Sequence, residues 1–275
     1  MKKVILGLII LVVAWFVASF TRGVFASKTS DTKQAVITAH RGGASLGEEN
    51  TIECIKRGMA AGAESIEVDV HITADGHIVV CHDATVDRTT NGSGAINNMT
   101  LEQIKALRIT NAQGEATDLQ IPTLEEVLET LNGEVELLLE IKRKSGNNQG
   151  VEAATLAIVQ QFDALPYTTF QSFDDEVLET LNSLDSSLSL EKLLFAKLIG
   201  LPVIFDGTFK YFSTKKYDYV SSFNFYYGAL SSSLSRYLHK HGYKIRIWTL
   251  NKPYAIPDIQ FDGIITDCPD RFLKK

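Results

Sequence analysis

The chain has 275 residues, enough for one large domain or two small ones. Hydrophobic residues make up 45% of it and charged residues 22%, a balance that excludes a disordered chain, a collagen and a transporter with many membrane spans. The formal net charge of −6 at pH 7 argues against nucleic-acid binding through a basic surface. The charge is uneven, because no acidic residue precedes Asp31 and residues 27–275 alone carry a net charge of −9.

Residues 1–26 form a hydrophobic N-terminal segment. Lys2 and Lys3 precede residues 4–20, which carry no formal charge. As a helix with a rise of ~1.5 Å per residue, this run would be about 26 Å long, close to the thickness of a bilayer's hydrocarbon core. Two interpretations remain open: an uncleaved transmembrane anchor, and a secretory signal peptide cleaved after Ala26. Both put the rest of the protein on the extracytoplasmic side of the membrane.

Residues 27–34 read as a polar linker and residues 35–275 as one domain, in which strand and helix patterns alternate. The expected strands cover residues 35–39, 65–73, 77–82, 135–141, 168–172, 192–196, 219–223, 244–250 and 263–266. The expected helices cover residues 51–61, 124–131, 151–162, 174–184 and 231–241. This alternation predicts parallel strands with helical crossovers, and a length near 250 residues favours a (β/α)₈ TIM barrel. An open, doubly wound sheet is less favoured, because no Gly-rich nucleotide-binding motif follows the first strand.

One expected strand exceeds the eight that a barrel needs. The turn residues Asp75 and Gly76 separate the second and third expected strands, so these two strands are predicted to form a hairpin. A two-residue turn there would place Asp69 directly opposite His82.

Candidate catalytic groups fall at the carboxyl ends of expected strands, where TIM barrels carry their active sites. The period of two places Glu67 and Asp69 on one face of a buried strand, where two carboxylates need a cation between them. Glu140 ends a run of three leucines, and its alternative role is an ion pair with Lys142. Three carboxylates together suit one hard divalent cation, Ca²⁺ or Mg²⁺.

Basic groups accompany these acids. His40 and His82 end expected strands, and Arg41 and Lys142 can bind an anion. Acidic and basic groups at one end of a barrel suit an anionic substrate bridged by a metal, such as a phosphate ester. The two histidines then fit a general acid and a general base.

Ordered sequence blocks between about residues 35 and 270 closely resemble the glycerophosphodiester phosphodiesterase family of metal-dependent (β/α)₈ barrels. The blocks are His40-Arg41-Gly42, Glu49-Asn50-Thr51, Glu67-Val68-Asp69-Val70, Thr73-Ala74-Asp75-Gly76, His82-Asp83, Arg88-Thr89-Thr90, Ile121-Pro122-Thr123-Leu124-Glu125-Glu126, Glu140-Ile141-Lys142, Ser172-Phe173, Trp248-Thr249-Leu250-Asn251 and Asp262-Gly263-Ile264-Ile265-Thr266-Asp267. One departure is Glu48, where the family usually has proline.

The resemblance implies hydrolysis of glycerophosphodiesters to sn-glycerol 3-phosphate and an alcohol. It matches His40 and His82 to an acid/base pair, Glu67, Asp69 and Glu140 to metal ligands, and Arg41 and Lys142 to phosphate contacts. Two roles come from the resemblance alone: Glu49 as an acid near the ion and Trp248 as an aromatic group that flanks the substrate. It also implies that residues 91–117 form an inserted lid, and their polar, glycine-containing sequence fits a mobile cover.

Alternative functions remain open. The enzyme could act in the manner of a phospholipase D on lysophospholipids, or on glycerophosphate polymers of a cell envelope. The chain could also be a pseudoenzyme that binds without catalysis, although none of the expected catalytic groups is missing. The predicted partners are a small-molecule substrate and, through the N-terminal segment, a membrane; no protein partner is inferred.

Overall fold

The computed structural model of the chain describes residues 35–143, 150–197, 204–205, 214–253 and 259–273. The predicted anchor or signal segment, residues 1–26, and the linker, residues 27–34, lie outside the described residues. Within the described ranges, no helix combines the length and the apolar character needed to cross a bilayer.

Eight parallel strands close into a barrel, as the sequence predicts. They are β1 (Val36–Ala39), β2 (Ser65–Ile72), β4 (Glu136–Ile141), β5 (Thr168–Ser172), β6 (Ser189–Leu194), β9 (Ser222–Tyr226), β10 (Lys244–Trp248) and β11 (Gly263–Thr266). Their order is β1-β11-β10-β9-β6-β5-β4-β2, and β1 also pairs with β2, which closes the ring. The carboxyl ends of these strands therefore share one end of the barrel, called the mouth below.

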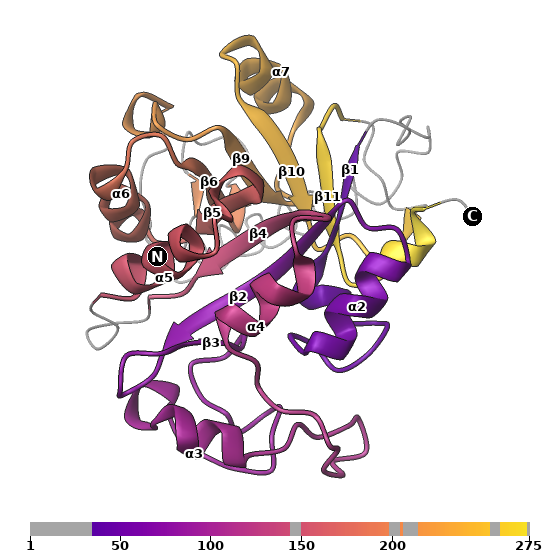
Figure 1. Cartoon of the computed structure of the whole chain (residues 1–275). Coiled ribbons are helices and arrows are strands. Elements are labelled where there is room, and N and C mark those ends of the chain that lie inside the picture. Colours follow the sequence, from indigo (N-terminus) through magenta and orange to yellow (C-terminus); the bar gives the residue numbers. More distant parts are fainter. Residues whose placement is uncertain (1–34, 144–149, 198–203, 206–213, 254–258, 274–275) are drawn as a thin grey trace, which may run out of the picture.

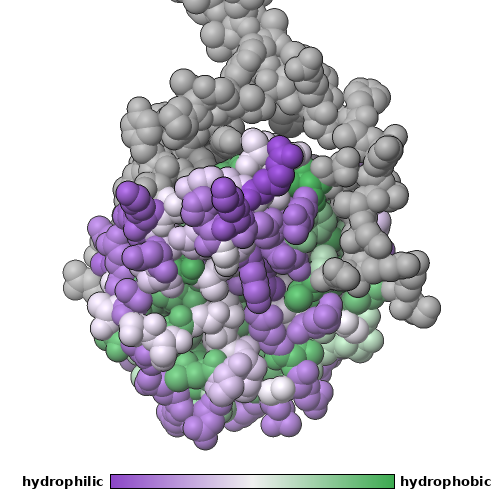
Figure 2. Space-filling view, turned by 90° about the horizontal axis from the view of Figure 1, so that it is seen from above, coloured by the Kyte–Doolittle hydropathy of each residue, from purple (hydrophilic) through white to green (hydrophobic). Residues whose placement is uncertain are grey.

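Helices surround the strands (Figure 1). The main ones are α2 (Ile52–Ala60), α4 (Leu124–Leu131), α5 (Val151–Gln161), α6 (Asp175–Leu184) and α7 (Ser232–Lys240). Thr51, Thr123 and Ser231 cap three of them with side chains that accept a backbone N–H. The apolar core lies between these helices and the outer faces of the strands, so the interior of the barrel is left for polar side chains. Hydrophilic residues dominate the face seen in Figure 2, and apolar residues form separate small areas on it.

Short elements complete the described chain. They are β3 (Ile78–Val80), β7 (Ala196–Lys197), β8 (Ile204–Phe205), α3 (Leu101–Ala106) and the 3₁₀ helices η2 (His40–Gly42), η3 (Ile96–Asn98), η4 (Leu165–Tyr167), η5 (Thr214–Tyr217) and η7 (Pro269–Arg271).

Two strands are displaced by about three residues from their expected positions. The strand expected at 192–196 begins at Ser189, and the strand expected at 219–223 begins at Ser222. Each contains a buried polar residue that the hydrophobic pattern does not predict in a strand: Glu191 in β6 and Asn224 in β9. The side-chain amide of Asn224 donates to Glu191 Oε2 at 2.7 Å. Inside this barrel, such polar groups satisfy one another.

The hairpin of β2 and β3 exists, but its predicted register is wrong. Val70 pairs with Val80, and the Cys81 N–H donates to the Asp69 carbonyl at 2.9 Å, so Cys81 and not His82 stands opposite Asp69. The turn has three residues instead of two, because Gly76 adopts a left-handed φ of 89°. One residue of turn length shifts the whole register by one position.

The inserted segment between β3 and α4 has a small hydrophobic core of its own. It carries η3 and α3, and lies beside α4 in Figure 1. This core consists of Val79 of β3 and of Cys81, Val86, Ile96, Ile104, Ile109 and Ile121 of the segment. The segment is thus packed more extensively than its polar, glycine-containing sequence predicts.

Candidate active site

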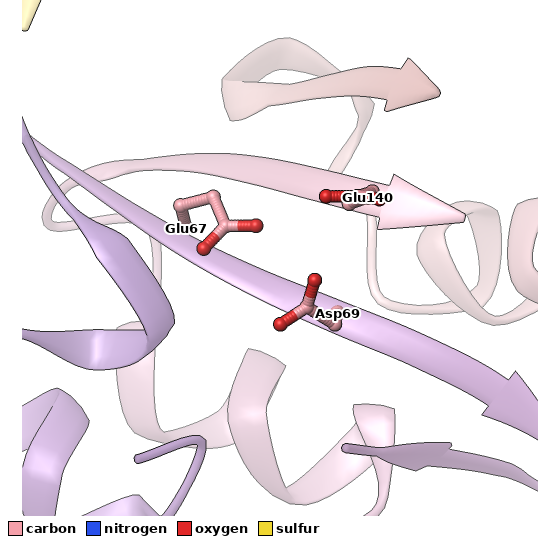
Figure 3. Close-up of side chains that lie close together, drawn as sticks. All are labelled: Glu67, Asp69 and Glu140. Atoms are coloured by element: carbon pink, nitrogen blue, oxygen red, sulfur yellow. The ribbon is translucent and has the colours of Figure 1, made fainter. Parts of the chain in front are cut away.

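Three carboxylates meet inside the barrel near its mouth. Glu67 and Asp69 project inward from β2, and Glu140 of the neighbouring β4 is in register with Asp69. One oxygen from each lies within 4.8 Å of the others. Figure 3 shows the three side chains close together on the two neighbouring strands. Glu67 and Asp69 are 0% exposed, and Glu140 is 7% exposed. These three residues, called the acidic cluster below, meet as the sequence predicts.

The electrostatics of the acidic cluster call for a cation. Burial raises the pKa of Glu67 to about 8, and the charge of Asp69 adds to the rise. Burial also raises the pKa of Glu140, against the opposing charge of Lys142. The pKa of Asp69 is lowered: burial opposes ionisation there, but the charges of Lys142 and His82 outweigh it. The protein's own cations therefore do not keep all three groups ionised at neutral pH, and buried oxygen donors of this kind fit Ca²⁺ or Mg²⁺.

Two basic side chains border the acidic cluster. Lys142 Nζ lies 3.0 Å from Asp69 Oδ1 and 2.9 Å from Glu140 Oε1, so the expected Lys142–Glu140 ion pair is present. Arg41 Nε lies 3.9 Å from Asp69 Oδ2. Both side chains are about one-fifth exposed. Each side chain therefore contacts the cluster and is also accessible from solvent, from which an anion would approach.

The loop after β1 is held tightly against the cluster. Arg41 adopts a φ of 51°, which is uncommon for a residue with a side chain. In this conformation its backbone N–H donates to Glu67 Oε2 at 2.8 Å. Helix α2 closes on the loop at Gly58, where a Cβ atom would stand 2.4 Å from the Gly42 carbonyl oxygen. The loop geometry thus depends on a strained residue and on a glycine in the neighbouring helix.

His40 begins this loop and is bonded to a distant carboxylate. Its Nδ1 lies 2.5 Å from Asp267 Oδ1, and its Nε2 lies 4.0 Å from Glu67 Oε2. Burial opposes the charged imidazolium, but the hydrogen bond to Asp267 and the charge of Glu67 outweigh it and raise the pKa of His40. Nδ1 of His40 is therefore bound by Asp267, while Nε2 faces the acidic cluster.

His82 follows β3 and is bonded to its neighbour in sequence. Its Nδ1 lies 2.6 Å from Asp83 Oδ1, and Arg88 Nε donates to Asp83 Oδ2 at 2.7 Å. Burial lowers the pKa of His82, with the charge of Asp69 opposing that shift. Glu49 lies outside the acidic cluster, since it accepts hydrogen bonds from Arg88 and from Arg41.

Aromatic rings occupy the other side of the mouth. Trp248 donates from Nε1 to the Asn224 carbonyl at 2.9 Å, and its ring contacts three others with centroid distances between 5.5 and 6.0 Å. We call these four residues the aromatic wall: Phe173, Phe195, Tyr226 and Trp248. Phe195 is 57% exposed, so the wall presents an apolar face to solvent.

Comparison with known proteins places this geometry in a family. The model of the glycerophosphoryl diester phosphodiesterase family matches residues 40–271, which include all nine predicted site residues. The chain belongs to this family. It is therefore an enzyme, a phosphoric diester hydrolase, rather than the non-catalytic binding protein considered above.

Two bacterial relatives of this phosphodiesterase match over most of their length. A glycerophosphodiester phosphodiesterase of Caldanaerobacter subterraneus is 32% identical over 246 residues, which cover 87% of this chain and 97% of the relative. Another, from Bacillus subtilis, is 30% identical over 254 residues, which cover 86% of this chain and 84% of the relative.

Solved structures confirm the fold of this phosphodiesterase. A phosphodiesterase of Oleispira antarctica, in complex with the product sn-glycerol-3-phosphate, superposes with a TM-score of 0.76 at 23% identity, over 88% of this chain and 96% of the other. A glycerophosphodiester phosphodiesterase of Agrobacterium tumefaciens gives 0.69 at 24% identity, over 86% and 99%.

Several site residues of this phosphodiesterase were not singled out from the sequence. Asn50 donates to Asp69 Oδ2 at 2.9 Å, and Asp267 pairs with His40. Asp267 directly follows β11, and a position at the carboxyl end of a barrel strand is a signal that could have identified it. The partners of Trp248 also follow or end strands, but single aromatic residues there do not stand out from core residues.

Proposed function

We propose that the chain hydrolyses glycerophosphodiesters to sn-glycerol 3-phosphate and an alcohol with the help of one divalent cation, Ca²⁺ or Mg²⁺. The observation that carries the proposal is the buried acidic cluster beside His40 in a chain of this family. The sn-glycerol-3-phosphate bound to the Oleispira antarctica phosphodiesterase is the product expected of this reaction.

Glu67, Asp69 and Glu140 would hold the cation, which when bound supplies Lewis-acid stabilisation of negative charge on the phosphate. Arg41 and Lys142 would neutralise the remaining phosphate charge. The planar guanidinium of Arg41 can bind two oxygens at once, so it also fixes the orientation of the phosphate.

His40 and His82 would move the protons. One takes a proton from the attacking hydroxyl, which belongs to water or to the substrate's glycerol, and a new P–O bond forms. The other gives a proton to the alcohol oxygen as the P–O bond to the alcohol breaks. When the attacking hydroxyl is that of the substrate's glycerol, the first product is a cyclic phosphate, which water then opens to sn-glycerol 3-phosphate. Both rings are bonded at Nδ1 to a carboxylate, which leaves Nε2 for this chemistry.

The test is replacement of each histidine in the full chain. His40→Ala and His82→Ala are each expected to lower kcat for glycerophosphocholine by about 10²–10⁴-fold, the usual contribution of a general acid or base. A coupled assay for released glycerol 3-phosphate measures this. His77→Ala is the control, because His77 lies exposed in the β2–β3 turn. Near-full activity of either active-site variant would contradict the proposed roles.

The aromatic wall favours a second candidate substrate. An apolar face beside a phosphate site suits a diester with an apolar group, as in phospholipase D-type action on a lysophospholipid. A higher kcat/KM for lysophosphatidylcholine than for glycerophosphocholine would support this candidate. Release of glycerol 3-phosphate from an envelope glycerophosphate polymer would instead support the polymer as substrate.

We also propose that the barrel works outside the cytoplasmic membrane. The support is the sequence of residues 1–26, with its basic start and uncharged run. The mass of the protein recovered from cell fractions tests this: a full-length chain in the membrane fraction indicates an anchor, and a chain that begins after Ala26 in the medium indicates a signal peptide. A full-length chain in the cytoplasmic fraction would contradict the proposal.

A further inference from the structure

Asp267 has no part in the proposed reaction, yet it is placed against one of the two histidines. Ala39, the last residue of β1, pairs with Thr266, the last residue of β11. The residues that follow them, His40 and Asp267, therefore lie side by side at the mouth. The result is the 2.5 Å contact between His40 Nδ1 and Asp267 Oδ1, across 227 positions of sequence.

The carboxylate of Asp267 is itself fixed. Asn251 Nδ2 donates to Asp267 Oδ2 at 2.7 Å, and the Asp267 backbone N–H donates to Asn251 Oδ1 at 2.9 Å. Thr266 Oγ1 donates to the same amide oxygen at 3.1 Å. Asn251 therefore engages one carboxylate oxygen and orients the other toward His40.

We propose that Asp267 is the positioning residue of His40. It accepts the proton of Nδ1–H, which leaves Nε2 toward the acidic cluster, 4.0 Å from Glu67 Oε2. If His40 is the base, this tautomer presents the lone pair of Nε2; if it is the acid, the carboxylate stabilises the imidazolium. The inference rests on the proposed function, because it assigns a role through His40.

The chain offers a matched control at the other end of the same strand. Asp262 precedes β11, and its Oδ2 lies 2.8 Å from Nε2 of His239 and accepts the Ile245 N–H at 2.8 Å. Each aspartate thus pairs with one histidine and with a second donor. Asp262 lies at the amino end of the strand, away from the mouth, so only Asp267 is expected to affect the reaction.

The kinetic experiment compares Asp267→Asn, Asp262→Asn, His40→Ala and the double variant H40A/D267N in the full chain. Asp267→Asn is expected to lower kcat on the order of 10²–10³-fold with KM changed by less than about 3-fold, because the asparagine amide favours the wrong tautomer. Asp262→Asn is expected to keep the parental kcat. In the His40→Ala background, Asp267→Asn is expected to cost nothing further, since it acts through the missing ring.

The second readout is the position of the proton on His40. The ¹⁵N shifts of labelled histidine, assigned with His40→Ala, report the tautomer at alkaline pH, where the ring is neutral. The proposal predicts Nδ1–H in the parental chain and Nε2–H in Asp267→Asn. Nε2–H in the parental chain, an unchanged kcat in Asp267→Asn, or losses that multiply in the double variant would each overturn it. Absence of turnover in the parental chain would contradict the proposed function instead, and the tautomer would still decide the role of Asp267.

Discussion

The two sides of the barrel mouth are built from different chemistry on the same scaffold. Strands β1, β2 and β4 carry, or lead into, ionisable groups: His40, Glu67, Asp69 and Glu140. Strands β6, β9 and β10 end in, or lead into, the rings of Phe195, Tyr226 and Trp248. Because parallel strands bring their carboxyl ends to one rim, a single barrel can present a charged half and an aromatic half to one substrate.

This difference separates two tasks. The charged half carries the groups proposed to bind phosphate and to move protons, so changes there should reduce the rate for every substrate. The aromatic half carries no group that titrates near neutral pH, so changes there should alter the choice between diesters with and without an apolar group. Substitutions in either half therefore test this division.

Glu67→Gln should cause the largest loss of activity, and it should stabilise the metal-free protein. Loss of a metal ligand should lower kcat/KM by about 10³-fold or more. In chelator, the same change should raise the melting temperature, because burial and Asp69 hold the pKa of Glu67 at about 8. The folded chain then binds this proton more tightly than the unfolded chain, so stability falls as pH rises from the usual glutamate range to about 8.

Thermal melts at several pH values, with and without chelator, measure both effects. Glu64→Gln is the matched control, since Glu64 directly precedes β2 and is exposed. A lower melting temperature for metal-free Glu67→Gln than for the parental chain at pH 8 would contradict the electrostatic account of the acidic cluster.

Lys142→Met should have an intermediate effect. Loss of a charge-assisted contact to phosphate should lower kcat/KM by roughly 10–100-fold. The affinity for the metal should stay the same or increase, because the charged Nζ of Lys142 lies 3.0 Å from Asp69 Oδ1 and repels a bound cation. Calorimetric metal titration and the coupled assay separate the two quantities.

Arg143→Met is the control for Lys142→Met, since Arg143 is the next residue but pairs with Glu152 of α5. Weaker metal binding with an unchanged KM in Lys142→Met would show that Lys142 serves the acidic cluster alone.

Phe195→Ala should have the smallest effect, and one that depends on whether the substrate carries an apolar group. Removal of an exposed apolar ring should lower kcat/KM by about 3–10-fold for a lysophospholipid and leave glycerophosphoethanolamine nearly unaffected. Leu184→Ala is the control, because Leu184 is a similarly exposed apolar residue at the end of α6. Equal losses on both substrates would break the division between the two halves.

Local patterns predicted the charged half well and the contacts between distant strands poorly. The alternation that puts Glu67 and Asp69 on one face follows from the geometry of a strand, so the sequence alone indicates it. The pair of His40 with Asp267 depends on closure of the barrel, which brings β1 beside β11, and no local pattern encodes that register.

The errors have equally local causes. The register of β2 with β3 depended on whether the turn at Gly76 has two residues or three, and one residue decides what stands opposite Asp69. β9 was placed too early, with its end directly before Asn224, because Asn224 is polar and its partner Glu191 lies on another strand. A buried polar side chain is recognisable only when its partner is known.

The most direct test of the account is release of sn-glycerol 3-phosphate from glycerophosphocholine by the full chain before and after chelation. Turnover is expected with Ca²⁺ or Mg²⁺, should be lost in excess EDTA and should return when the cation is restored, because a cation would balance the charge of the acidic cluster. Full activity in excess EDTA, with no metal retained by the protein, would contradict it.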